Sequence, residues 1–174
     1  MTTITIGSAP LTLAQLRTVL DGPVTVSLSP AAWADVEKSA AVVAAILAEG
    51  RTVYGINTGF GLLANTSIAP EDLETLQKNL VLSHACGVGA LLPDAVTRLL
   101  MVLKIASLSK GASGVRRGTL EALIALVNAD VLPCIPSKGS VGASGDLAPL
   151  SHMTLAMLGV GQVRFNGEIT PAAD

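Results

Sequence analysis

The sequence predicts a mainly α fold with a few short β-strands and one hairpin, and three observations support this prediction. Most apolar residues recur at helical spacing, the long periodic segments begin at serine or proline, and strand-like alternation is confined to short stretches. The chain has 174 residues, half of them hydrophobic and 14% charged, so it can form a real core. So few charges leave little polar surface, and we expect extra burial against partner subunits or another part of the polypeptide.

Two helices and a strand are expected in the first fifty residues. A short helix covers Thr12 to Leu20 and ends at Gly22, and Pro23 to Leu28 alternates like a strand. Ser29 and Pro30 then supply an N-cap and a first-turn proline for a helix that runs to about Glu49. The expected buried stripe of this helix consists of Trp33, Val36, Ala40, Val43 and Leu47.

Three further helices are expected in the middle of the chain. Arg51 to Asn57 is expected to be extended, and the glycine-rich stretch after it is expected to be irregular. Pro70 starts a helix, and Pro93 starts another that is nearly apolar all round from Val96 to Leu108, so it should be buried on most sides. The stripe of the first is Leu73, Leu76, Leu80 and His84; a later helix, about Val115 to Ala129, buries Leu120, Leu123, Ile124 and Val127.

The last part of the chain is expected to contain a loop, a helix and a hairpin. Val131 to Gly145 is rich in proline and glycine and predicts a loop, after which a helix resumes with Asp146 placed to cap it. Asn166-Gly167 predicts the turn of a small hairpin. Without an internal repeat or a linker, residues 1–174 are expected to form a single domain.

Composition disfavours several classes of function. The net charge is −2 with no basic cluster, which argues against a nucleic-acid partner. The N-terminus lacks the features of a signal peptide, and no apolar run reaches membrane-spanning length. Cys86 and Cys134 have neither metal nor redox spacing, which favours a reduced cytoplasmic setting and no metal site.

One motif for nucleotide binding can be set aside. Gly59 to Ala64 matches the loose GxGxxA form of a dinucleotide fingerprint. Such a site also needs an acidic residue about 20 positions later, and this chain has His84 near that position instead. We therefore reject a dinucleotide site.

The triplet Ala143-Ser144-Gly145 has the composition needed for backbone cyclisation. The first residue must be small so that its carbonyl can be approached, and a glycine in third place lets its amide reach that carbonyl. The central serine offers a leaving hydroxyl, so loss of two waters would give a methylidene-imidazolone electrophile. The triplet alone is a weak signal, because a second copy stands at Ala112-Ser113-Gly114. An ordinary loop is the default interpretation of either triplet. We interpret the copy at Ala112-Ser113-Gly114 as the start of a helix.

The stretch GSVGASGDLAPLSHM, Gly139 to Met153, resembles the signature of the aromatic amino-acid ammonia-lyase and aminomutase family. The segments YGINTGFG (Tyr54 to Gly61), LVLSHACGVG (Leu80 to Gly89) and LPCIPSKGS (Leu132 to Ser140) resemble that family too, in the same order. The resemblance spans the chain from about Leu11 onward. Two departures are Ala106, where asparagine is expected, and Ala112, where a larger side chain is expected; neither touches the triplet.

The resemblance implies the N-terminal helical domain of the ammonia-lyase fold and a non-oxidative deaminase. Family members run to roughly 500 residues, a length that ordinarily holds several domains, so residues 1–174 are expected to be an N-terminal fragment, inactive alone. It also implies a 4-methylidene-imidazol-5-one formed from Ala143-Ser144-Gly145, with no external cofactor. That triplet is expected to need the surrounding fold in order to cyclise. The partners implied are an amino-acid substrate and further copies of the chain in a homotetramer.

Tyr54 is, by the same resemblance, the catalytic base. A free phenol titrates near pH ~10, so the site would have to favour the phenolate. Judged from the residue alone, a half-buried ring with a satisfied hydroxyl is the alternative. Asn57, Gly59 and Gly61 are expected to shape the loop that holds Tyr54, and Asp146 is expected to cap a helix and orient the cyclised ring.

His84, preceded by Ser83, resembles the histidine-specific branch of the family. Its imidazole could hydrogen-bond the imidazole of a substrate, whereas an apolar substrate ring would leave it unpaired. The activity implied is conversion of L-histidine to trans-urocanate and ammonia. A satisfied core histidine is the alternative for the residue. A tyrosine or phenylalanine ammonia-lyase or aminomutase, or a catalytically silent helical oligomerisation fragment, is the alternative for the chain.

Overall fold

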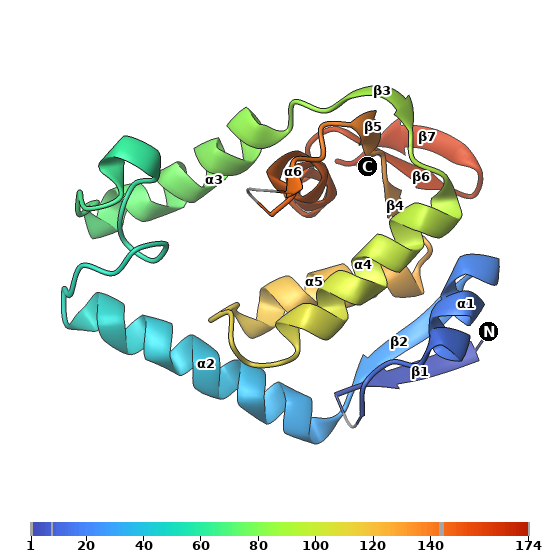
Figure 1. Ribbon diagram of the computed structural model, residues 1–174, viewed down its shortest axis with the longest axis horizontal. Coiled ribbons are helices and arrows are strands. Elements are labelled where there is room, and N and C mark those ends of the chain that lie inside the picture. Colours follow the sequence, from blue (N-terminus) through green and yellow to red (C-terminus); the bar gives the residue numbers. More distant parts are fainter. Residues whose placement is uncertain (1, 8, 143–144, 174) are drawn as a thin grey trace.

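The computed structural model describes residues 2–7, 9–142 and 145–173 of the chain (Figure 1). Its α-helices are α1 (Leu13–Asp21), α2 (Pro30–Ala48), α3 (Leu73–His84), α4 (Asp94–Leu108), α5 (Arg117–Asn128) and α6 (Leu147–Met157). Its strands are β1 (Thr2–Ile6), β2 (Val24–Leu28), β3 (Val88–Leu91), β4 (Leu132–Pro133), β5 (Pro136–Lys138), β6 (Gln162–Phe165) and β7 (Glu168–Pro171). Two 3-10 turns, η1 (Gly61–Leu63) and η2 (Pro70–Asp72), precede α3. The predicted mainly α fold with short strands and a hairpin is confirmed.

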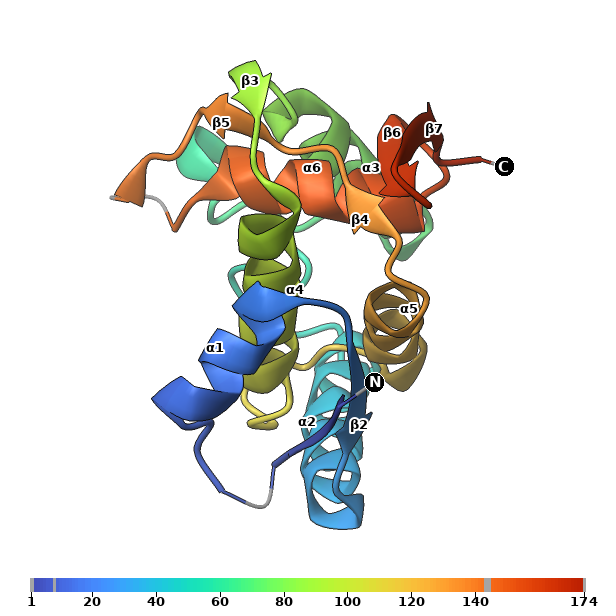
Figure 2. The same cartoon turned by 90° about the vertical axis from the view of Figure 1, so that its right-hand side faces the viewer.

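Helix α4 joins two groups of elements. In Figure 2, α3 and α6 lie with β3 to β7 on one side of the molecule, and α1, α2, β1 and β2 lie on the other. Helix α4 runs between them and contacts α1, α5 and β4. Its residues Met101, Val102 and Ile105 are completely buried. The core therefore extends from the N-terminal strands through α4 and α5 to Met153 of α6.

The N-terminal strands form a parallel pair. Strand β1 pairs with β2 so that Ile4 lies opposite Val26, and α1 makes the crossover that parallel strands need. The free edge of β2 is covered by Asn128 at the end of α5. Its Oδ1 accepts a hydrogen bond from the Val26 amide at 2.6 Å, and its Nδ2 donates to the Val26 carbonyl at 3.1 Å. Strand β1 was not predicted, because its paired residues in β2 lie 22 positions later and no tight turn joins the two strands.

The starts of α1 and α2 carry side-chain caps. Thr12 Oγ1 accepts from the Gln15 amide at 3.2 Å, and Gln15 Oε1 accepts from the Thr12 amide at 2.9 Å, which is a capping box. Ser29 Oγ accepts from the Ala32 amide at 3.2 Å, with Pro30 at the first helical position. The predicted starts of both helices are confirmed.

The predicted stripe of α2 is confirmed except at its end. Val36 is buried, and Trp33, Ala40 and Val43 are partly buried. In the last turn Ile46 is buried, whereas the predicted Leu47 is exposed. The Gly114 amide donates to Ser39 Oγ at 2.7 Å. Gly114 ends the second Ala-Ser-Gly triplet, which is a loop two residues before the α5 cap rather than part of the helix.

Helix α4 is less buried than predicted. Val96 and Leu103 are each more than two fifths exposed, because no described element covers that face. With Leu99, Leu100 and Leu150 they line an open apolar groove of about 410 Å³. None of the helices in the described ranges combines the length and apolar character needed to cross a membrane.

The segment predicted as a loop from Val131 to Gly145 contains two short strands. Strand β4 pairs antiparallel with β6, and β5 pairs antiparallel with β3. The loop prediction is wrong there, because prolines are tolerated at the ends of such short strands. The hairpin of β6 and β7 is confirmed, with Asn166 at φ 52° and Gly167 at φ 81°, as a two-residue turn requires.

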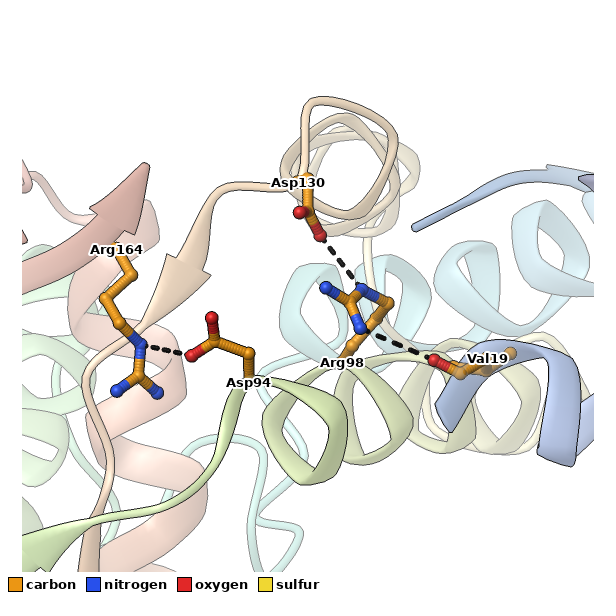
Figure 3. A network of polar contacts seen from close by, with 5 residues as sticks. All are labelled: Val19, Asp94, Arg98, Asp130 and Arg164. Carbon is orange, nitrogen blue, oxygen red and sulfur yellow. Dashed lines mark hydrogen bonds and ion pairs between the residues drawn. The ribbon is translucent and has the colours of Figure 1, made fainter. Parts of the chain in front are cut away.

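A polar network fixes α4 to its neighbours (Figure 3). The buried Arg98 of α4 donates from Nε to Asp130 Oδ1 at 2.9 Å and from Nη1 to the Val19 carbonyl at 3.5 Å. One turn earlier, Asp94 forms an ion pair with Arg164 of β6. A buried guanidinium requires such partners, so the network fixes how α1, α5 and β6 meet α4.

Candidate active site

Tyr54 lies in a turn that the side chain of Asn57 closes. Residues 54–56 form the turn, so the prediction that Arg51 to Asn57 is extended is wrong. Asn57 Oδ1 accepts from the Val53 amide at 2.8 Å, and Asn57 Nδ2 donates to the Arg51 carbonyl at 3.0 Å. Asn57 is 5% exposed and Tyr54 is 62% exposed. A buried amide thus holds a turn that presents the phenol to the outside.

A second loop follows directly and touches the first. An antiparallel bridge between Thr58 and Ser67 closes its base. The Phe60 ring meets the Tyr54 ring edge-on, with the ring centroids 5.8 Å apart. Phe60 was not among the predicted site residues, because no local pattern shows that two loop aromatics will meet.

The two glycines predicted to shape this region have different physical reasons to be glycine. A Cβ on Gly59 would lie 2.4 Å from the Leu63 Cβ, a clash. Gly61 has φ +59° at the start of η1, a conformation that costs other residues energy. The irregular course predicted for this stretch is confirmed.

His84 is the last residue of α3 and is half-buried. Its Nδ1 lies 2.8 Å from the Leu80 carbonyl oxygen and 3.1 Å from Ser83 Oγ. A carbonyl oxygen can only accept, so Nδ1 carries the proton in this arrangement. In the neutral ring the opposite nitrogen, Nε2, is then a hydrogen-bond acceptor.

The predicted electrophile triplet immediately precedes α6. Ala143 and Ser144 lie outside the described residues, whereas Gly142 and Gly145 on either side are described. The Gly145 amide donates to the Gly142 carbonyl oxygen at 3.4 Å, and Gly145 has φ +79°. Apart from its chain neighbours, no atom of the described residues lies within 4 Å of the position that a Cβ on Gly145 would take. Gly142 and Gly145 therefore lie close together, and the described residues leave space beside Gly145.

Asp146 occupies the N-cap position of α6 but makes no side-chain cap. Its backbone is left-handed, with φ 59°, and its carboxylate accepts from the Ser140 hydroxyl instead of an α6 amide. The prediction of a plain capping aspartate is therefore wrong at the level of the side chain. The bond with Ser140 ties together the two ends of the segment that contains the triplet.

A cavity of about 330 Å³ lies beside Gly145 and Asp146. This volume suits a small molecule. Its lining combines apolar side chains with two serines: Leu92, Leu100, Pro136, Ser137, Ser140, Pro149 and Leu150. Tyr54 and His84 are not among the residues that line it.

Of the predicted site segments, those that contain His84 and the triplet lie in or next to elements that pack together. Among the described residues, no hydrogen bond or ring contact joins the Tyr54 loop to them. Helix α3, which ends at His84, packs against α6, which follows the triplet. The Gly87 amide donates to His152 Nε2 of α6 at 3.0 Å. His152 was missed because, in sequence, it stands among the apolar residues of a helix. Within the described ranges no three His, Cys, Asp or Glu residues are grouped so as to hold a metal ion.

Comparison with known proteins extends over nearly the whole chain. The family model described as aromatic amino acid lyase matches residues 11–174. The chain is 61% identical over 159 residues to a histidine ammonia-lyase of Vibrio cholerae, covering 91% of this chain and 31% of that protein. The crystal structure of a histidine ammonia-lyase from Trypanosoma cruzi matches with a TM-score of 0.90 at 37% identity, over 98% of this chain and 33% of that one.

A second solved structure is equally similar in fold. It is the ergothioneine-degrading enzyme ergothionase from Treponema denticola, with a TM-score of 0.93 at 30% identity, over 98% of this chain and 34% of that one. The chain thus spans about a third of the length of the proteins that it matches. Fold similarity alone does not choose a substrate.

Proposed function

This chain belongs to the aromatic amino acid lyase family, and we propose that the protein carrying it removes ammonia from L-histidine to give trans-urocanate. The observation that carries the proposal is the 61% identity to a histidine ammonia-lyase. It is supported by the packing of α3, which ends at His84, against α6, which begins two residues after the triplet.

The proposal includes a 4-methylidene-imidazol-5-one made from Ala143-Ser144-Gly145, with no external cofactor and no metal. The left-handed Gly145, its bond to Gly142 and the open space beside it support such a closure, because the glycine amide must approach a carbonyl two residues back. The group, once formed, supplies an electrophile that takes up electrons as the substrate loses ammonia. The cavity beside Gly145 is of a size to receive an amino acid.

The residues of the chain have separate roles in this proposal. Tyr54 takes the β-proton of the substrate, and Asn57, Gly59 and Gly61 hold the loop that presents it. His84 accepts a hydrogen bond at Nε2 from the imidazole N–H of the substrate, since Nδ1 is engaged by the Leu80 carbonyl. Phenylalanine offers no such donor, which favours histidine.

We further propose that the active protein is a cytoplasmic homotetramer and that residues 1–174 alone are inactive. Exposed apolar residues on several helices and loops support an assembly, among them Leu13, Val42, Leu62 and Leu103. Tyr54 and His84 are both outside the lining of the cavity in this single chain. Residues from elsewhere in the assembly would then complete the site.

The decisive experiment compares full-length protein with its Ser144→Ala variant by intact mass and by urocanate formation. We expect the unaltered protein to lack the mass of two waters and the variant to have full mass and no turnover. Ser113→Ala, in the second Ala-Ser-Gly triplet, is the matched control and should keep both the mass deficit and the activity. An active protein with full mass would refute the proposal.

The choice of substrate needs its own comparison. Full-length protein is assayed with histidine, tyrosine and phenylalanine, beside His84→Leu. We expect histidine to be preferred and the variant to lose that preference. A variant that keeps the full preference for histidine would refute the role of His84, and a protein that prefers tyrosine or phenylalanine would support the alternative activities.

A further inference from the structure

We propose that His152 is a positioning residue that fixes the substrate-recognising end of α3 against the electrophile-bearing start of α6. The inference rests on the proposed function and adds to it a residue of the signature Gly139 to Met153 that the proposed function leaves without a role. It depends on one hydrogen bond between segments that are 65 residues apart, from the Gly87 amide to His152 Nε2 at 3.0 Å.

His152 lies close to both halves of the site. It is the sixth residue after Asp146, so it lies about 9 Å along α6 from that N-cap residue, which follows the triplet. Gly87 is the third residue after His84, and the turn between them is tight, with the Cys86 amide donating to the His84 carbonyl at 2.9 Å. A shift of Gly87 would therefore move His84.

The packing around this bond is tight at Gly87, where a Cβ would crowd its neighbours. A Cβ there would lie 3.1 Å from His152 Nε2 and 3.3 Å from the Lys138 carbonyl oxygen. Gly139 makes a third close approach, because its Cβ would lie 3.1 Å from the Gly87 Cα and 3.3 Å from the Ala148 Cβ. The end of α3, the end of β5 and the first turns of α6 thus meet at a junction of two glycines and one alanine, and His152 is the hydrogen-bonding side chain that binds Gly87 there.

The bond requires a neutral imidazole. Nε2 accepts the Gly87 N–H, so the proton of the ring is on Nδ1. Partial burial of His152 lowers its pKa below the usual value, which keeps the ring in the accepting form. His152 therefore contributes a hydrogen-bond acceptor, and not a positive charge, to the site.

The test uses the full-length protein and variants that remove or keep the acceptor. His152→Phe keeps a ring without an acceptor, and His152→Gln keeps an acceptor on a flexible side chain. Gly87→Ala disturbs the same contact from the other side, because its Cβ would lie 3.1 Å from His152 Nε2, while the His152 side chain is kept. Thr154→Val is the control, because it removes an α6 hydrogen bond that stays within the helix, from Thr154 Oγ1 to the Leu150 carbonyl at 2.8 Å.

Each variant is measured by intact mass, by kcat and KM for histidine, and by hydrogen exchange of the amides in residues 85–89. We expect His152→Phe and Gly87→Ala to lose about fivefold in kcat/KM, the value of one hydrogen bond, with the two-water deficit unchanged. Exchange at 85–89 should rise by a similar factor. His152→Gln should recover most of both, and Thr154→Val should match the unaltered protein.

Two results would overturn the inference. One is exchange at 85–89 that is the same in His152→Phe as in the unaltered protein, and the other is a kcat/KM within twofold in both His152→Phe and Gly87→Ala. Failure of the proposed function looks different, because the unaltered protein itself would then have full mass and no turnover. The exchange measurement still decides, in that case, whether His152 holds the end of α3.

Discussion

Replacing Asn57 with alanine should open the loop that carries Tyr54 without unfolding the protein. The side chain makes both hydrogen bonds that close the turn, to Val53 and to Arg51, and it is 5% exposed. Each such bond contributes about 1 kcal/mol net, so alanine costs the closed loop about 2 kcal/mol. At about 1.4 kcal/mol for each factor of ten, the equilibrium constant for loop opening rises roughly 30-fold.

The assay follows hydrogen exchange of residues 51–59 and kcat for histidine in full-length protein. We expect faster exchange confined to this segment, and a lower kcat because Tyr54 spends less time in place. Asn57→Asp keeps the Oδ1 acceptor but places a second carboxylate oxygen against the Arg51 carbonyl oxygen in a nearly buried site, so it should open the loop at least as much as alanine does. Asn65→Ala, an exposed asparagine of the neighbouring loop, should leave both measurements unaltered.

The outcome that counts against this reasoning is exchange of Asn57→Ala at the rate of the unaltered protein. Faster exchange with an unchanged kcat would have a different meaning. It would keep the account of the loop but remove Tyr54 from the rate-determining chemistry.

Three further changes test the scaffold, each by urea unfolding. In Asp130→Asn the asparagine tolerates the left-handed backbone, but the charge that pairs with Arg98 is removed. The variant should lose about 1–3 kcal/mol of unfolding free energy, less than for a fully buried pair because Asp130 is one third exposed. A loss under about half a kcal/mol would contradict the stabilising role of this ion pair. Asn128→Leu leaves the amide and carbonyl of Val26 unpaired and should cost about 2–4 kcal/mol, whereas a stability equal to that of the unaltered chain would show that water replaces the side chain. The pKa of His152 is lowered by burial from 6.5, so the unfolded chain binds more protons just below pH 6.5, and stability should fall as the pH drops through 6.5 toward the folded pKa. His152→Gln should lack this slope, and an equal slope in both proteins would assign it to other groups.

Elements were predictable where neighbouring residues decide them. Ser29-Pro30 fixes a helix start by capping and by proline geometry, and Asn166-Gly167 fixes a turn because both residues tolerate positive φ. The α3 stripe was visible for the same reason, since helical spacing needs no distant partner. These local signals established the helical framework.

The residues of the site were predictable, but the hydrogen bonds that hold its segments together were not. Asn57, His84 and Gly145 were identified by their motifs, yet nothing nearby in sequence indicates that Asn57 closes a turn with two bonds. The bond between Gly87 and His152 joins segments 65 residues apart, and so has no periodicity to reveal it. The side chain of Asp146 was misassigned because its partner, Ser140, precedes the helix.

Several of these hydrogen bonds are of the same kind, from a side chain to the backbone. In each, one polar side chain satisfies backbone groups of an irregular segment: Asn57 for the Tyr54 turn, His152 for the end of α3, Asn128 for the edge of β2. Buried or half-buried backbone groups in such segments cannot pair within a helix or sheet, and leaving them unpaired costs more than the net value of the bond. Substitutions at these side chains should therefore change where site residues lie more than whether the helices form, because the helical core is built from Met101, Ile105, Leu120 and their neighbours.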